Sequence, residues 1–247
     1  MNGMETPWRL DHEVVIFDCD GVLLDSNGLK IDAFRRTLEL NSFAPELVAA
    51  GSIWQSKSFG TSRYKLFAEM LGGRFGEPPE VSLEKLLDDF GRLCAAGYLA
   101  VPETPKLRSA LAALFRQAKL YVASGSDEAE LRSVFQRRSL AAFFDEIYGS
   151  PPSKIDSIHR VKSAFMSAGG NPDAHMLFVG DALADLEAAQ ATGCDFVFMA
   201  PYSTVRSVML ERATRDGFPV IENIGQLADA YRAFAVPGDA RQNQKGS

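Results

Sequence analysis

A short apolar run that ends in two closely spaced carboxylates constrains this chain more than any other stretch. Residues Val14–Phe17 are all apolar, and Asp18 and Asp20 follow, separated by a single cysteine. Four apolar residues that run into turn-forming residues are typical of a buried β-strand. Side chains two residues apart in an extended segment point to the same side. We therefore expect the two carboxylates to converge on one spot.

Two carboxylates this close repel each other, and the conflict has more than one resolution. A bound cation can neutralise them, or one can act as a nucleophile while the other carries a proton. The alternative is a solvated turn at a strand end, since aspartate and glycine both favour turns. The ends of the other strands distinguish between these interpretations.

The second half of the chain alternates short apolar runs with helical patterns. The strand candidates, in order, are Leu120–Ala123, Phe143–Tyr148, Met176–Val179, Phe196–Met199 and a short edge strand, Pro219–Ile221. Strands that alternate with helices predict a parallel sheet covered by helices on both faces. The expected fold class is therefore α/β, with a Rossmann-like parallel sheet core.

A long all-helical insertion is expected inside this core. Between the first strand and the second, apolar residues recur with helical spacing and no stretch has the pattern of a strand. Helical segments include Val48–Ile53, Tyr64–Leu71 and Leu83–Leu93. The domain boundaries that follow are 13–26 plus 98–236 for the core and 27–97 for the helical domain. The polar ends, 1–12 and 237–247, are expected to be flexible.

Composition and charge exclude several partners. The chain has 247 residues, 46% of them hydrophobic, and a net charge of −6 without any basic run. Neither a nucleic acid nor an anionic membrane surface is therefore an expected partner. No stretch reaches membrane-spanning length or resembles a signal core. The three cysteines are far apart, so we expect reduced thiols and a cytoplasmic protein. The oligomeric state has no signal in the sequence.

Polar side chains follow several of the predicted strands, at the edge where parallel α/β sheets bind ligands. Ser124 ends the second strand, Lys154 follows the third, and Asp181 ends the fourth, with Asp185 one helical turn later. Oxygen ligands alone suit a hard ion such as Mg²⁺. Ser124 and the amides after it can bind phosphate oxygens, and Lys154 supplies positive charge.

In these segments and their order the chain resembles the haloacid dehalogenase superfamily. The four motifs that carry the resemblance are Asp18-Cys19-Asp20-Gly21-Val22, Val122-Ala123-Ser124-Gly125, Lys154, and Gly180-Asp181-Ala182-Leu183-Ala184-Asp185. The resemblance covers roughly Glu13–Ser26 and Tyr98–Phe234. The helical insertion is similar to the type-one cap of the phosphatase branch. Ala182 stands where many relatives carry a small hydroxyl residue.

The resemblance implies a role for each motif residue. Asp18 would attack phosphorus and form an aspartyl-phosphate, and Asp20 would act as general acid and then as general base. Mg²⁺ would be held by the Asp18 carboxylate, the Asp20 backbone carbonyl and Asp181, with Asp185 acting indirectly. Residues expected to bind the substrate are Gly21, Ser124, Gly125, Lys154 and, from the cap, Arg63.

The cap residue Arg63 is proposed from a local pattern. Gly60-Thr61-Ser62-Arg63-Tyr64-Lys65 reads as a polar, glycine-led loop that opens a helix. We expect Arg63, together with Lys65, to contact an anionic or hydroxyl-rich leaving group, and a solvated helix start is the alternative. Asn27 and Lys30, just after the hinge, are expected to face the cleft. Trp54 and Phe59 are expected in the cap core.

Other nucleophiles fit the sequence less well. Cys19 points to the opposite side of the strand from its two neighbours and is expected to pack as a small apolar residue. The histidines, His12, His159 and His175, do not follow the predicted strand ends, so a Ser-His-Asp hydrolase is not indicated. No phosphate-binding P-loop motif is present. The acid/base aspartate at position 20 favours phosphoryl transfer over dehalogenation.

The leading hypothesis is a magnesium-dependent phosphatase that acts on a small phosphorylated metabolite, either a sugar phosphate or a compound like phosphoglycolate. The cap would close over the site, exclude water and select the leaving group. The first alternative is a phosphomutase of the β-phosphoglucomutase kind, which would use the same aspartates. The second is a regulator that binds a phosphorylated ligand without turning it over.

Overall fold

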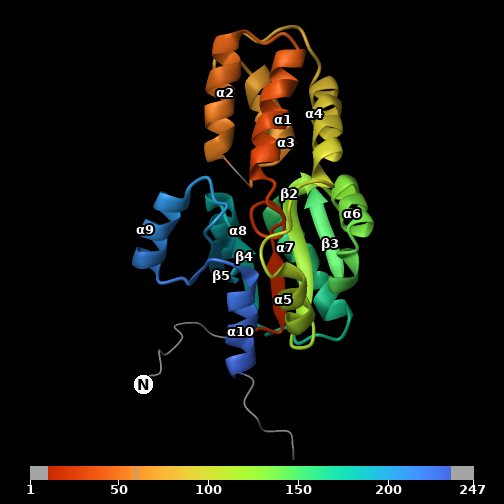
Figure 1. Cartoon of the computed structure of the whole chain (residues 1–247), viewed down its shortest axis with the longest axis vertical. Helices are drawn as coiled ribbons and strands as arrows, with labels where there is room; N and C mark the ends of the chain where they lie inside the picture. Colours follow the sequence, from red (N-terminus) through yellow and green to blue (C-terminus); the bar gives the residue numbers. More distant parts are fainter. Residues whose placement is uncertain (1–10, 59, 235–247) are drawn as a thin grey trace, which may run out of the picture.

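The structure, a computed structural model, describes residues 11–58 and 60–234. A sheet with flanking helices forms one part, and four helices form a separate group at one end of it (Figure 1). Of the termini expected to be flexible, only residues 11 and 12 are described; Phe59 also lies outside the described residues. His12 is buried, and its ring nitrogens lie 2.8 Å from the Asp195 carboxylate and 3.3 Å from the Tyr231 hydroxyl.

A six-stranded sheet with the order β3-β2-β1-β4-β5-β6 forms the core, and all neighbouring pairs are parallel. The strands are β1 (Val14–Phe17), β2 (Lys119–Asp127), β3 (Glu146–Ser150), β4 (Met176–Gly180), β5 (Asp195–Met199) and β6 (Val220–Ile221). The central strand β1 lies between β2 and β4, and Phe17 is paired with Val122 and Val179. The residues that follow these three strands are therefore neighbours.

Helices cover both faces of the sheet. They are α5 (Leu107–Leu114), α6 (Glu128–Arg137), α7 (Lys154–Ser167), α8 (Leu183–Thr192), α9 (Arg206–Asp216) and α10 (Ile224–Phe234), with a 3₁₀ turn, η1, at Ala141–Phe143. Side chains alternate along β1: Val15 and Phe17 belong to one apolar cluster, and Val14 and Ile16 belong to the other. The first cluster includes side chains of α5, α6 and α10, and the second includes those of α7, α8 and α9.

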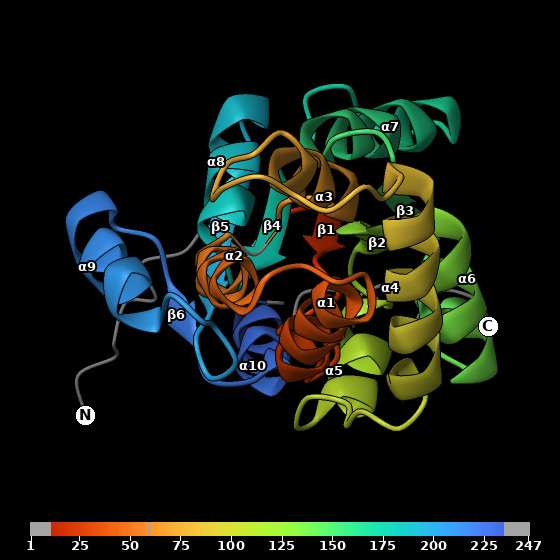
Figure 2. The same ribbon diagram turned by 90° about the horizontal axis from the view of Figure 1, so that it is seen from above.

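The four remaining helices stand above the carboxyl ends of the strands (Figures 1 and 2). They are α1 (Asn27–Leu40), α2 (Pro45–Lys57), α3 (Arg63–Leu71) and α4 (Leu83–Tyr98). Phe67 is their packing centre: its ring stacks on Phe34 at 5.0 Å and meets Phe90 edge-on at 5.5 Å. The expected α/β core with an inserted helical cap is thus confirmed. The domain boundary at residues 27–97 stays a prediction.

The strand predicted over Phe143–Tyr148 was placed too early. Residues Ala141–Phe143 form the 3₁₀ turn η1, and β3 begins at Glu146. Phe144 instead packs its ring against Phe17 and Phe135, at centroid distances of 6.2 and 5.6 Å. A short apolar run does not by itself distinguish a strand from a turn that packs one side chain, here Phe144, into the core.

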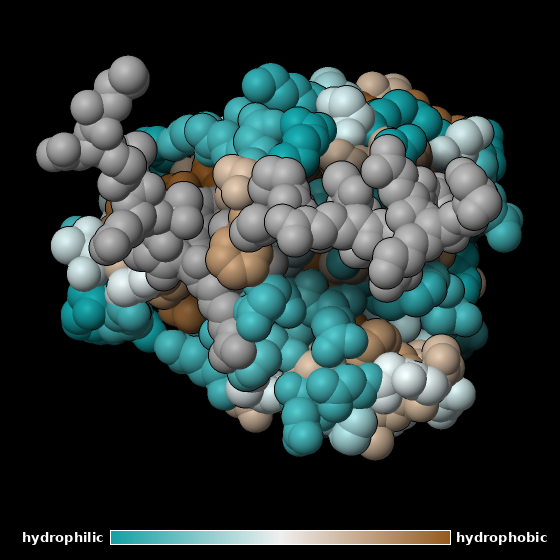
Figure 3. Space-filling model, turned by 90° about the horizontal axis from the view of Figure 1, so that it is seen from below, coloured by the Kyte–Doolittle hydropathy of each residue, from teal (hydrophilic) through white to brown (hydrophobic). Residues whose placement is uncertain are grey.

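Within the described residues, every helix falls short of the length and apolarity that crossing a membrane requires. Seen from the side opposite the cap, the part of the surface that Figure 3 colours by hydropathy is mostly hydrophilic, with scattered hydrophobic residues.

Replacing Phe67 with alanine tests whether the cap depends on its own aromatic centre. Phe67 is fully buried, so Phe67→Ala is expected to lower the free energy of unfolding by about 3–5 kcal/mol. Ile53, which is 60% exposed on α2, provides the matched control, and Ile53→Ala is expected to cost under about 0.5 kcal/mol. Urea unfolding measures both variants. A Phe67→Ala cost as small as the control would contradict this packing.

Candidate active site

The predicted polar residues meet at the carboxyl ends of the central strands. Asp18 follows β1 directly, and its backbone N–H donates to the carbonyl of Val179 on β4 at 3.0 Å. Asp181 follows β4, and Lys154 is the first residue of α7. The whole predicted core set is buried: Asp18, Asp20, Ser124, Lys154, Asp181 and Asp185. The strand order brings them together from segments that lie far apart in the sequence.

Three of these carboxylates form a compact acidic cluster. Carboxylate oxygens of Asp18, Asp181 and Asp185 all lie within 4.8 Å of one another. The Asp185 carboxylate accepts the backbone N–H groups of Asp181 and Ala182, both at 3.0 Å, which fixes its position at the start of α8. Burial, followed by the charges of Asp185 and Asp18, raises the pKa of Asp181 well above its ordinary value.

Lys154 provides the positive charge beside this cluster. Its ammonium forms an ion pair with Asp185 and lies 3.2 Å from Oδ1 of Asp18. Burial alone would lower the pKa of Lys154, but Asp18 and Asp185 outweigh it and raise that pKa. Burial raises the pKa of Asp18 to about 6, although Lys154 opposes this shift. The lysine therefore favours the ionised form of the Asp18 carboxylate.

One lysine does not balance three buried carboxylates, and the donor set fits a divalent cation. Among the described residues, Oδ1 of Asp18 has no hydrogen-bond donor of good geometry, although the Lys154 ammonium is near. Oxygen-only ligands match the preference of hard divalent ions. Such an ion would offset the repulsion that raises the pKa of Asp181.

The glycine after Asp20 is needed because of close packing. Gly21 has a positive φ of 74°, and a Cβ there would overlap the Asp181 carboxylate and approach Asn27 Nδ2 to 2.6 Å. Asn27, at the start of α1, donates to Oδ2 of Asp181 at 2.7 Å and to the carbonyl of Tyr202 at 2.9 Å. Asn27 therefore does reach the site, by contacting the acidic cluster.

The carboxylate of Asp20 is held by four side chains. Oδ1 accepts from Ser26 Oγ at 2.6 Å and from the Tyr98 hydroxyl at 2.7 Å. Oδ2 accepts from Ser126 Oγ at 3.0 Å and forms an ion pair with Lys30. Burial alone would raise the pKa of Asp20, but the Lys30 charge and the hydrogen bonds from Lys30, Ser26 and Tyr98 lower it. Lys30 was expected to face the cleft, and the structure places its ammonium in an ion pair with Asp20.

Tyr98 and Ser126 were missed by sequence reasoning. Tyr98 ends an amphipathic helix, where its ring fits the apolar face, and Ser126 is one of two serines near the end of β2. Burial raises the pKa of the Tyr98 phenol well above its ordinary value, so it stays a hydrogen-bond donor. The sequence offered one signal for Tyr98: it is an aromatic residue with a hydroxyl, and it stands at the predicted boundary between the cap and the core.

A cap loop lies directly on the site. Gly60 has a positive φ of 84°, and a Cβ there would come within 2.7 Å of Ala184 and 3.7 Å of the Lys154 ammonium. A Cβ on Gly125 would come within 3.0 Å of the Gly60 carbonyl oxygen. Ser124 Oγ accepts the backbone N–H of Ser126 at 3.3 Å. The cap loop at Gly60 and the end of β2 at Gly125 are therefore in contact.

Arg63 has a protein partner in this structure. Its guanidinium forms two hydrogen bonds with the Glu130 carboxylate, at 2.8 and 2.6 Å, and lies 4.8 Å from the Phe90 ring centroid. Lys65 is exposed. The neighbouring Tyr64 hydroxyl donates to Asp127 at 3.2 Å. Contact between Arg63 and a substrate stays a prediction, since the guanidinium is engaged by α6.

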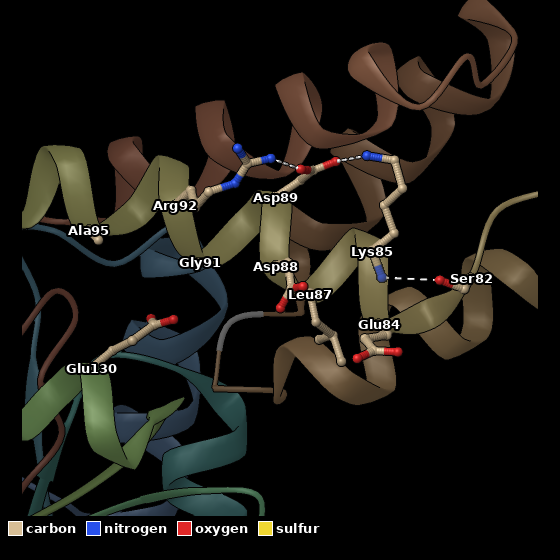
Figure 4. Close-up of a pocket in the computed structure, with 10 residues that line it drawn as sticks. All are labelled: Ser82, Glu84, Lys85, Leu87, Asp88, Asp89, Gly91, Arg92, Ala95 and Glu130. Atoms are coloured by element: carbon tan, nitrogen blue, oxygen red, sulfur yellow. Dashed lines mark hydrogen bonds and ion pairs between the residues drawn. The ribbon is translucent and has the colours of Figure 1, made fainter.

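Glu130 also borders a surface hollow that is separate from the acidic cluster (Figure 4). The hollow has a volume of about 620 Å³, and the other residues that line it belong to α4 and its N-cap, Ser82. None of the predicted site residues lines it. Its polar walls are largely paired, because Asp89 forms ion pairs with Lys85 and Arg92. The acidic cluster is therefore the stronger candidate for chemistry.

Cys19 and Trp54 have the structural roles expected of them. Burial, and then the charges of Asp20 and Asp18, raises the pKa of the Cys19 thiol well above its ordinary value, so a thiolate is disfavoured. Trp54 packs against the apolar cluster that includes the cap core. The Arg74 guanidinium lies over its ring, with Cζ 4.7 Å from the ring centroid. All three cysteines are buried and free.

Comparisons with known proteins agree with this fold and identify the family. The family model of haloacid dehalogenase-like hydrolases matches residues 12–193. The phosphoglycolate phosphatase of Rhodospirillum rubrum is 26% identical over 234 residues, which cover 93% of this chain and 94% of that protein.

Two solved structures illustrate the likeness in fold. A predicted phosphatase from Clostridium acetobutylicum has a TM-score of 0.69 at 20% identity, over 90% of this chain and 99% of that chain. CbbY from Rhodobacter sphaeroides, in complex with xylulose-(1,5)bisphosphate, has a TM-score of 0.66 at 16% identity, over 87% and 96% of the two chains. At these identities the two structures show the shared α/β core and helical cap.

Adding Mg²⁺ to the metal-free protein tests the acidic cluster. At 100 times the dissociation constant, binding is expected to raise the Tm by roughly 5 °C, because the ion binds the folded state. Asp181→Asn is expected to abolish most of this rise, and the metal-free variant is expected to be at least as stable as the unchanged protein. Asp173→Asn, at an exposed carboxylate, is the control and should retain the rise. Equal rises in all three proteins would rule out a cation at this cluster.

Proposed function

This chain belongs to the haloacid dehalogenase-like hydrolases and is a phosphatase, and from that premise we propose its reaction. The proposed reaction is Mg²⁺-dependent hydrolysis of a small phosphorylated metabolite through an aspartyl-phosphate on Asp18. One observation carries the proposal: Asp18 lies in a buried carboxylate cluster, 3.2 Å from the Lys154 ammonium, with Asp20 beside it on the chain.

Asp18 is the proposed nucleophile. Its carboxylate oxygen forms a bond to phosphorus while the bond from phosphorus to the leaving oxygen breaks. Attack requires the ionised carboxylate, which the Lys154 ammonium favours against the effect of burial. The same ammonium reduces the repulsion between the carboxylate and an incoming phosphate. Ser124 and the amide of Gly125, at the end of β2, are proposed to bind the phosphoryl oxygens, as is the glycine at position 21.

Asp20 is the proposed general acid and base. In the first step the protonated form of Asp20, which its lowered pKa makes the minor form, gives a proton to the leaving oxygen. In the second step the carboxylate takes a proton from the water that attacks the aspartyl-phosphate. The second step releases phosphate and restores the Asp18 carboxylate. Four surrounding donors fix the direction of the Asp20 carboxylate, which supports a role that depends on geometry.

Mg²⁺ would be held by the carboxylates of Asp18 and Asp181 and by the backbone carbonyl of Asp20, with Asp185 supporting the site indirectly. When bound, it would neutralise negative charge on the carboxylates and on the phosphoryl group. Asp185 holds the amides of residues 181 and 182 and pairs with Lys154, which supports an indirect role.

The proposed substrate is a small anionic or hydroxyl-rich phosphate ester, either a sugar phosphate or a compound like phosphoglycolate. The relative named phosphoglycolate phosphatase supports this class, as does the CbbY structure with a sugar bisphosphate. The cap loop at Gly60, in contact with the site, supports a leaving group small enough to be enclosed. Three free, buried cysteines support a location in the reducing cytoplasm.

A phosphatase assay over small phosphate esters tests the proposed reaction. With Mg²⁺ the protein is expected to release free phosphate from at least one ester, whereas a chelator should abolish the release. Asp18→Asn is expected to lower kcat by at least about 10⁴, because the amide cannot form the aspartyl-phosphate. Isomerised sugar phosphate in place of free phosphate would indicate a mutase. Full activity in Asp18→Asn would refute the mechanism.

Arg63 is proposed to contact the leaving group while it is paired with Glu130. A guanidinium has five N–H donors, and Glu130 accepts two of them in this structure. Arg63→Ala is therefore expected to raise KM by about tenfold with little change in kcat. Glu130→Gln, the control, keeps the guanidinium and should raise KM less than about threefold. Steady-state kinetics on the best ester decides, and equal effects of the two variants would favour a purely structural pair.

A further inference from the structure

Tyr98 lies where the last cap helix, α4, returns to the core, and its hydroxyl reaches into the site. We propose that Tyr98 is a positioning residue for the acid/base carboxylate of Asp20, and that Arg138 anchors Tyr98 in turn. The inference rests on the function proposed above and concerns a contact between segments 78 residues apart.

The contact is short and fully enclosed. Tyr98 is 2% exposed, and its hydroxyl donates to Oδ1 of Asp20 at 2.7 Å. The hydroxyl also lies 3.2 Å from Ser126 Oγ, which itself donates to the other carboxylate oxygen. Among the described residues, Ser26 is the other side-chain donor to Oδ1. Both oxygens of Asp20 are therefore directed by a small set of hydroxyls in addition to Lys30.

Tyr98 differs from Lys30 in rigidity. Lys30 reaches Asp20 through a flexible four-carbon chain, whereas a tyrosine places its hydroxyl with only two side-chain torsions. The Tyr98 ring is also packed in the large apolar cluster that spans the cap and one face of the sheet. The hydroxyl of Tyr98 is therefore held more rigidly by packing than the Lys30 ammonium.

Arg138 ties the backbone of Tyr98 to the core. It follows α6, and its Nη1 donates to the carbonyl oxygens of Tyr98 and Val101, both at 2.8 Å. Arg108 donates in turn to the carbonyl of Arg138 at 2.6 Å. Although Tyr98 belongs to a cap helix, its backbone is thus held by a core residue, Arg138, which follows α6.

The consequence concerns proton transfer. Without the Tyr98 hydroxyl, Oδ1 of Asp20 keeps only the Ser26 donor, and the carboxylate gains rotational freedom. The first chemical step needs a proton from Asp20 only when the leaving group is a poor one, such as an alkoxide. A p-nitrophenolate leaves without a proton. If Asp20 is only mispositioned, the loss in kcat/KM should therefore depend on the leaving group. General damage to the site should lower kcat/KM equally for all leaving groups.

The experiment compares kcat/KM for 2-phosphoglycolate and for p-nitrophenyl phosphate, because kcat/KM reports the transfer of the phosphoryl group to Asp18. Tyr98→Phe is expected to lower kcat/KM about tenfold for 2-phosphoglycolate and less than twofold for p-nitrophenyl phosphate. Tyr231→Phe removes another buried tyrosine hydroxyl, the one beside His12, and should change neither value. Equal losses on both esters, or no loss, in Tyr98→Phe would overturn the inference.

Arg138→Met tests the anchor. It is expected to show the same selective loss, about threefold for 2-phosphoglycolate, and the double variant with Tyr98→Phe should lose no more than Tyr98→Phe alone. A fully multiplicative loss in the double variant would contradict the anchoring role.

Asp20→Asn distinguishes failure of the proposed acid role of Asp20 from failure of the proposed positioning role of Tyr98. If Asp20→Asn slows both esters equally, the proposed acid role fails; if it is selective and Tyr98→Phe is not, only this inference fails. No turnover of any ester in the phosphatase panel by the unchanged enzyme would overturn both.

Discussion

The repulsion among three buried carboxylates is the constraint on which the rest of the site depends. Carboxylate oxygens of Asp18, Asp181 and Asp185 lie within 4.8 Å of one another, and Lys154 forms ion pairs with two of these residues. Backbone amides hold Asp185 in place, and the order of the central strands brings Asp181 beside Asp18. An arrangement of this kind costs stability unless a cation binds, so the fold maintains a site whose oxygen ligands suit a divalent cation.

The cap contributes to this site at close range. Its loop at Gly60 touches the core, Arg63 pairs with Glu130 across the two parts, and Lys30 and Tyr98 hold the carboxylate of Asp20. The cap therefore supplies side chains that orient the carboxylate of Asp20, the proposed acid/base. Within the proposed mechanism, selection of the leaving group and delivery of its proton depend on the same docked arrangement.

The sequence predicted those features that depend on local rules. Asp18 follows from its place directly after an apolar strand, Asp185 from the helical turn after Asp181, and the helix Leu183–Thr192 from its pattern and the glycine that ends it. The contact from Tyr98 to Asp20 spans 78 residues, and that from Arg138 to Tyr98 spans 40, so both depend on how the cap docks. No periodicity encodes such contacts, and the partner of Arg63 was missed for the same reason.

The central claim is that Asp18 carries the phosphoryl group between the two steps. Mixing the enzyme and Mg²⁺ with a ³²P-labelled ester, followed by a rapid acid quench and peptide mapping, measures this directly. The account predicts that acid-stable, base-labile label appears before the first turnover ends, on the peptide that contains Asp18. Rapid turnover with label on no peptide, or on the peptide that contains Ser124 instead, would contradict it.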